Sequence, residues 1–188
     1  MMNIISKIND KMNKLPKKVV DAAACCVFIS IIALTDQLIK SAVARSMTEG
    51  QTKPFIDGFM QWTYSLNSGA SWSILSGRTG FLIFVALAGI SLGAYFLITD
   101  KIRHATGFCA FVLIVGGAAG NLIDRLFRGG LVIDYIDIRP WFNFPIFNFA
   151  DCCITVGAVF MVVYVIFFFE DRPEDETETE LTDETGKD

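Results

Sequence analysis

The stretch ATGFCAFVLIVGGAAGNLIDR, residues 105–125, decides the fold. It begins as an apolar run of a length that can cross a bilayer, which takes about 20 residues of helix. It ends in Asn121, Asp124 and Arg125, whose spacing of three and four residues places them on one helix face. The small residues at 116–120 allow a neighbouring helix backbone to come close. The pattern predicts a closely packed transmembrane helix with polar side chains at one end.

Three further apolar runs of similar length occur in the 188-residue chain. They extend from about Val19 to Ile39, from Thr79 to Ile98 and from Phe149 to Phe169, and the quoted run is expected to be helical over Ala105 to Ile123. Charged residues make up only 19% of the chain and apolar residues 53%, whereas a soluble domain usually carries about 25% charged residues. We therefore predict an all-α membrane protein with four transmembrane helices.

The distribution of basic residues predicts which side each end faces. Five lysines precede the first helix, and Lys101 and Arg103 lie between the second and third helices. Basic residues favour the cytoplasmic side, so both termini are expected there, although basic residues in the outer loops weaken the bias. The expected organisation is a basic segment at 1–18, a four-helix domain with two outer loops at 19–169, and an acidic cytoplasmic tail at 170–188, expected to be disordered.

The two outer loops contain strand-like sequence. Residues 59–66 suit a strand, and Asn67-Ser68-Gly69 after them is typical of a turn. Residues 131–138 place β-branched side chains beside acids. Tryptophan and phenylalanine side chains follow at 141–147, as is common at a membrane interface. We expect a small sheet on the outer membrane face.

Ionisable side chains gather at the outer ends of the first, third and fourth helices and in the loop that joins the last two. An acid at the centre of a membrane helix costs roughly 2.5 to 3.5 kcal/mol, so such residues are functional candidates. Asp36 and Lys40 share a helix face and have an ion pair as their structural alternative. Asn148 and Asp151 open the fourth helix, where capping is the alternative for Asn148 and the helix dipole favours a carboxylate at Asp151.

Asp134 has no comparable structural explanation, because it lies between Ile133 and Tyr135 in an apolar stretch. Two close aspartates share one proton, so that one can activate water while the other hydrogen-bonds a carbonyl. Asp134 and Asp151 are 17 residues apart, and a returning loop can bring them together. The sequence therefore indicates an aspartic peptidase.

Other chemistries find less support. The single histidine, His104, cannot supply the ligand set of a typical zinc site, and it is expected on the cytoplasmic side, away from the outer serines. A serine–lysine pair with Lys40 or Lys53 remains an alternative. We expect no metal, no cofactor and no nucleic-acid partner.

Five segments together carry a resemblance to a known family. They are Asp36-Gln-Leu-Ile-Lys40, Asn67-Ser-Gly-Ala-Ser-Trp72, Gly116-Gly-Ala-Ala-Gly-Asn121-Leu-Ile-Asp124-Arg125, Val132-Ile-Asp134-Tyr-Ile-Asp137 and Phe147-Asn148-Phe-Ala-Asp151. In this order, on a chain with four predicted spans, they resemble the lipoprotein signal peptidases (signal peptidase II). Trp72 and Tyr135 stand where that family commonly has phenylalanine.

The resemblance implies a reaction and a set of site residues. The family cleaves signal peptides from prolipoproteins, just before a cysteine that carries diacylglycerol, in the bacterial inner membrane with the active site at the periplasmic face. The implied catalytic pair is Asp134 and Asp151. The residues implied to line or adjoin the substrate site are Asn67, Gly69, Asn121, Arg125 and Asn148, with Asp36 and Lys40 beside it. The implied fold is four transmembrane helices with a small periplasmic β-sheet, the cradle, and a short periplasmic helix. Membrane lipids and globomycin-type inhibitors are the further implied partners.

Three other functions are compatible with an apolar chain of this kind. A small proton-coupled membrane transporter also uses intramembrane acids, but here the acids gather at one end and form no path through the middle. A presenilin-type protease carries a Gly-x-Gly-Asp motif, which this sequence lacks. A membrane scaffold would have no use for the polar residues.

Overall fold

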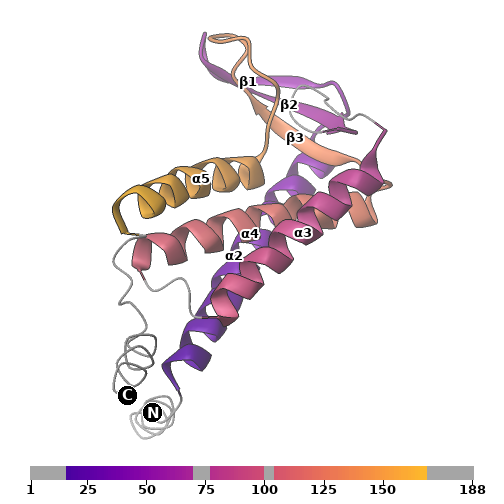
Figure 1. The fold of residues 1–188 in the computed structure, drawn as a ribbon. Helices are drawn as coiled ribbons and strands as arrows, with labels where there is room; N and C mark the ends of the chain where they lie inside the picture. The colour runs from indigo at the N-terminus through magenta and orange to yellow at the C-terminus, as the bar shows by residue number, and fades with distance from the viewer. Residues whose placement is uncertain (1–15, 70–76, 100–103, 169–188) are drawn as a thin grey trace, which may run out of the picture.

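A computed structural model describes residues 16–69, 77–99 and 104–168. Within these ranges the chain forms four long helices and one sheet of three strands (Figure 1). The elements in chain order are α2 (Lys17–Ser46), β1 (Thr52–Ile56), β2 (Met60–Asn67), α3 (Thr79–Ile98), α4 (Ala105–Phe127), β3 (Val132–Asp137) and α5 (Phe149–Phe168). All four helices contain a stretch that is long and apolar enough to cross a membrane, as predicted.

Two helices are longer than the apolar runs that predicted them. α2 continues past Ile39 to Ser46, and α4 continues past Ile123 to Phe127. Each extension begins with a charged residue that is fully buried, Lys40 in α2 and Asp124 in α4, and these two side chains form an ion pair inside the protein. An apolar run therefore marks the part of a helix that faces lipid or the protein core, but it does not mark the residue at which the helix ends. Of the predicted fourth helix, Phe169 lies outside the described residues.

α4 packs against each of the other three helices. The close approach depends on its small residues, as the sequence predicted. A Cβ atom at Gly117 would collide with the backbone oxygen of Ala150 in α5, and one at Gly116 would lie 2.8 Å from the Ile32 side chain in α2. At Gly120 it would lie 2.6 Å from an oxygen of Asp36. The glycines thus give α2 and α5 access to the polar end of α4.

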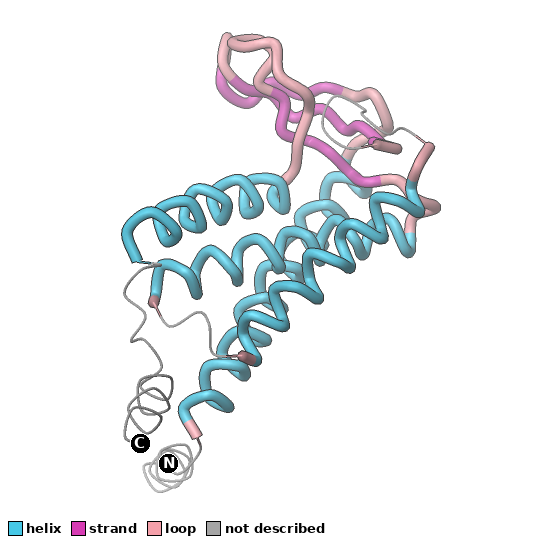
Figure 2. The backbone as a smooth tube through the Cα atoms, in the orientation of Figure 1, coloured by secondary structure: helices cyan, strands magenta, loops and turns pink. Residues whose placement is uncertain are grey.

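The sheet is antiparallel with the order β1-β2-β3. It lies at one end of the helices, where α2 and α4 end and α5 begins (Figures 1 and 2). Ser65 of β2 is the partner of Asp134 in β3, and the register shifts between Trp62 and Ser65. The strands at residues 59–66 and 131–138 are confirmed to within about one residue. The described residues contain no short helix besides the four long ones, so that part of the expected fold is not confirmed.

One apolar cluster fixes the sheet to the end of α2. Its buried members are Val43, Met47, Ile133 and Tyr135. Ile133 and Tyr135 flank Asp134 and, since side chains alternate along a strand, point to the opposite face of the sheet. Because Ile133 and Tyr135 are buried on one face of β3, the Asp134 carboxyl group lies on the other face, toward the start of α5.

Candidate active site

Asp134 and Asp151 both accept hydrogen bonds from the same residue, Asn148. The Asn148 side-chain amide donates to Oδ1 of Asp134 at 2.6 Å, and the Asn148 backbone N–H donates to Oδ2 of Asp151 at 3.0 Å. Asn148 is fully buried and only 3% of Asp134 is exposed. A carboxyl group in the middle of a strand and one in the first turn of a helix are thus connected through one buried asparagine.

Asp134 is shielded from water on most sides. Its second oxygen, Oδ2, accepts a hydrogen bond from the Asn67 side chain at 2.9 Å. Burial and the nearby Asp151 carboxylate raise the pKa of Asp134 to about 7, against the opposing effect of the Asn67 and Asn148 amides. At neutral pH the Asp134 carboxyl group therefore retains a proton in a substantial fraction of molecules.

Asp151 is held by the start of its own helix. Its backbone N–H donates to Oδ1 of Asn148 at 3.1 Å, while its carboxylate accepts the Asn148 backbone N–H. This reciprocal pair is a capping box, with Asn148 as the cap that the sequence indicated. The other oxygen, Oδ1, accepts from the Asn121 side chain at 2.8 Å. Both oxygens of Asp151 therefore have donors, one from the backbone at the start of α5 and one from the Asn121 amide.

A cluster of buried charged residues adjoins the Asp134 and Asp151 site. Lys40, Asp36 and Asp124 are all fully buried, and the Lys40 ammonium lies 2.7 Å from Asp36 and 3.0 Å from Asp124. Its third partner is Oδ1 of Asn121, at 2.8 Å. Asn121 thereby connects the cluster to Asp151. Asp36 and Lys40 form the ion pair that was their structural alternative, and Lys40 also contacts Asn121, which holds the candidate acid Asp151.

The two acids of this cluster also hold the elements that carry the candidate pair. Asp36 accepts the backbone N–H of Ala150 at 3.1 Å, and Asp124 accepts that of Ile133 at 3.1 Å. Ala150 directly precedes Asp151, and Ile133 directly precedes Asp134. The sequence placed Asp124 among the candidate acids at the helix ends but assigned it no role in the site. Its position on the Asn121 face of the helix was the available signal.

Arg125 positions the turn after β2. From the sequence, two roles were open for Arg125: an ion pair with Asp124, or a hydrogen bond to a backbone carbonyl of the substrate. In the structure its guanidinium donates to the backbone oxygens of Gly69 at 2.9 Å and Asn121 at 3.3 Å. The Gly69 N–H in turn donates to the Asn67 side-chain oxygen at 2.9 Å, which leaves the Asn67 amide directed at Asp134. Among the described residues, Nε of Arg125 is the buried side-chain polar atom without a partner.

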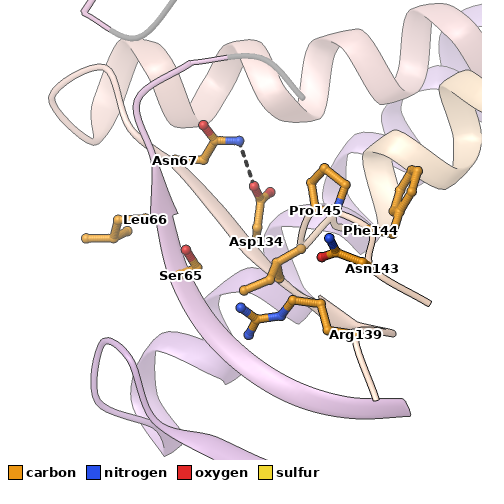
Figure 3. A pocket seen from close by; sticks show the side chains of 9 residues that line it. Ser65, Leu66, Asn67, Asp134, Arg139, Asn143, Phe144 and Pro145 are labelled. Atoms are coloured by element: carbon orange, nitrogen blue, oxygen red, sulfur yellow. Dashed lines mark hydrogen bonds between the residues drawn. The ribbon is translucent and has the colours of Figure 1, made fainter. Parts of the chain in front are cut away.

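A cavity of about 390 Å³ opens beside Asp134 on the sheet side (Figure 3). The described residues that line it are Ser65, Leu66, Asn67, Asp134, Arg139, Asn143, Phe144, Pro145 and Ile146. Asp134 is therefore accessible from a space that lies outside the helices. The described residues contain no group of three or more His, Cys, Asp or Glu side chains arranged to hold a metal ion. The arrangement supports water activation by two carboxyl groups that share a proton.

The Lys40 cluster yields a stability prediction. Lys40→Met would leave Asp36 and Asp124 buried without their cation, and breaking a buried ion pair on one side costs about 3 to 5 kcal/mol. We expect a large fall in the thermal unfolding midpoint of the purified protein in detergent. Lys17→Met, which breaks an exposed ion pair with Asp21, is the control and should change stability by about 1 kcal/mol or less. Equal midpoints for the two variants would show that the cluster does not stabilise the site.

Known proteins show the same fold and sequence pattern. A model of the signal peptidase (SPase) II family matches residues 28–167. The lipoprotein signal peptidase of Clostridioides difficile (strain 630) is 40% identical over 142 residues, which cover 76% of this chain and 93% of that protein. The corresponding Listeria monocytogenes serotype 4a (strain HCC23) protein is 40% identical over 148 residues, covering 78% and 93%.

A solved structure is also similar. It is described as a bacterial membrane enzyme at 2.3 Å resolution, and it superposes with a TM-score of 0.73 and 30% sequence identity over 81% of this chain and 93% of its own. The sequence match and the shared fold therefore agree over most of the chain. The chain belongs to the signal peptidase II family.

Proposed function

We propose that Asp134 and Asp151 are the catalytic pair with which this membrane aspartic peptidase removes signal peptides from prolipoproteins. Family membership supports the reaction. The observation that carries the assignment of the pair is the contact of both carboxyl groups with the buried Asn148. The other buried acids at this end of the molecule have cationic partners: Lys40 pairs with Asp36 and Asp124, and Arg139 pairs with Asp137.

The surroundings of the two acids support different roles. Asp134, whose pKa is raised to about 7, carries the shared proton and donates it to the oxygen of the scissile carbonyl. Asp151, at a helix N-terminus, takes a proton from water as the water oxygen attacks the carbonyl carbon. The tetrahedral intermediate then collapses: its C–N bond breaks, the proton on Asp151 passes to the departing amine, and the carbonyl re-forms as its oxygen returns a proton to Asp134.

The amides around the pair act as positioning groups. Asn67, Asn121 and Asn148 each donate to a carboxyl oxygen of the pair. We assign them the tasks of orienting the acids and lining the substrate site, together with the turn at Gly69. The unpartnered Nε of Arg125 supports a role of this side chain in holding a backbone carbonyl of the substrate, because a buried donor without an acceptor costs free energy until it is paired.

The position of the pair also supports a location for the reaction. The acids lie at the sheet end of helices that can cross a membrane. We propose that this end is the outer face of the bacterial inner membrane, with both termini cytoplasmic. A substrate with diacylglycerol on its cysteine would then approach sideways from the lipid, with its scissile bond at the interface. Globomycin-type inhibitors are expected to compete for this site.

Replacing either acid by its amide tests the pair. We expect Asp134→Asn and Asp151→Asn each to lower kcat/KM by at least about a thousandfold, because neither amide can transfer the proton that the mechanism needs. Cleavage of a diacylglyceryl-modified prolipoprotein by purified enzyme in detergent is the measurement. Asp57→Asn, in the exposed turn between β1 and β2, is the matched control and should cleave at the parent rate. Cleavage at that rate by either dyad variant would refute the assignment.

The raised pKa of Asp134 predicts the pH dependence. Below about pH 7 this carboxyl group is protonated, and above it the group ionises beside Asp151. We therefore expect kcat/KM to fall as the pH rises through about 7, since the shared proton is lost. The measurement is the same cleavage assay followed from about pH 5 to about pH 9. An activity that keeps rising across this interval would contradict the assignment of the proton to Asp134.

A further inference from the structure

The cavity beside Asp134 lies on the side of the pair that faces away from the helices. Its described lining comes from the end of β2, from Asp134 in β3 and from the loop after β3, and none of it belongs to α2, α3, α4 or α5. Figure 3 shows the Asp134 carboxyl group between β2 and the loop, with Asn143 and Pro145 on the other side of the space. A molecule in this cavity would contact Asp134 without entering the part of the protein that crosses the membrane.

This inference rests on the proposed function. The substrate that reaches Asp134 then has three parts: the signal peptide, the lipid-modified cysteine and the mature polypeptide. The signal peptide is apolar, and the acyl chains of the modified cysteine are more apolar still, so both are stable within the bilayer. The mature polypeptide that follows the cysteine is the part that continues into water. A cavity built from the sheet and an outer loop is therefore in the place that this third part must occupy.

The lining suits an extended, uncharged peptide. The cationic wall residue, Arg139, is already neutralised, because its guanidinium donates to both oxygens of the buried Asp137 at 2.8 and 2.6 Å. Asp137 also accepts from Gln61 and Thr63. Although burial opposes its ionisation, the hydrogen bonds from Arg139, Gln61 and Thr63 together lower the pKa of Asp137. The Arg139–Asp137 pair is thus a fixed part of the wall, and Arg139 is not free to bind a separate acid.

The remaining polar groups of the wall can bind a peptide backbone. The Asn143 side chain is exposed and makes no hydrogen bond within the part of the chain that the structure describes. A primary amide both donates and accepts, so it can pair with a peptide N–H or C=O. Leu66, Phe144, Pro145 and Ile146 supply apolar surface around it. The volume of about 390 Å³ lies within the range of small-ligand pockets, roughly 300 to 1,000 Å³.

We propose that this cavity is the binding site for the first residues of the mature lipoprotein, those that directly follow the modified cysteine. The scissile bond then lies at Asp134, with the signal peptide toward α5 and the mature segment across the end of β2. Asn143 contacts the backbone of that segment, and the volume of the cavity limits the size of its side chains. The enzyme therefore selects substrates by residues after the cleavage point as well as by those before it.

The test compares two synthetic substrates with the same signal peptide and the same modified cysteine. One ends in an amide directly after the cysteine, and the other continues for several residues. The readout is the ratio of kcat/KM for the extended substrate to that for the truncated one. Asn143→Trp fills the cavity, and we expect this ratio to fall about tenfold, in line with the discrimination that pocket contacts provide. Asn143→Ala, which removes the amide without adding bulk, should lower it about threefold to fivefold.

The control is Asp57→Trp, in the exposed turn between β1 and β2 and outside the cavity, which should leave the ratio unchanged. An unchanged ratio in both Asn143 variants, or an equal loss on both substrates, would overturn the inference. Failure of the catalytic assignment gives a different result, because Asp134→Asn would then still cleave the truncated substrate at the parent rate. A lower ratio in both Asn143 variants with no effect of Asp57→Trp supports the cavity as the site of the mature segment.

Discussion

The hydrogen bonds of Asn148 connect the start of α5 to the middle of β3. With its backbone and side chain it donates to Asp151 and Asp134, and its side-chain oxygen accepts the Asp151 N–H. A buried carboxyl group is stable only where donors or a shared proton compensate for the lost water. Asn148 supplies such donors to both acids, and so it fixes the position of one carboxyl group relative to the other.

The rest of the molecule keeps this asparagine and its two acids in place. Glycines in α4 let α2 and α5 approach, and the approach buries Asp36 and Lys40 against the polar end of α4. The lysine holds Asn121, which donates to Asp151, while its acidic partners hold the backbone next to each member of the pair. The packing of the apolar helices is thereby coupled to the geometry of the two carboxyl groups.

Much of this arrangement was predictable from the sequence, for identifiable reasons. Apolar runs mark membrane helices reliably because lipid tolerates few polar side chains, and acids at the ends of such runs stand out. β1 escaped prediction because all five of its residues are exposed and it contains Pro54, so no alternation marks it. The partner of Asp124 was hidden as well, since spacing places it on a helix face but cannot tell that Lys40 of another helix meets that face. The cavity depends on where the loop after β3 returns, which no local pattern encodes.

Burial and the neighbouring Asp151 carboxylate together keep a proton on Asp134, and a carboxyl titration can separate the contribution of the neighbour. Carbon-13 NMR of aspartate-labelled enzyme in detergent can follow the Asp134 carboxyl group, identified by its loss in Asp134→Asn. We expect a midpoint at about pH 7 in the parent enzyme and a clear shift to lower pH in Asp151→Asn, where the neighbouring charge is gone. The same midpoint in both proteins would contradict a shared proton.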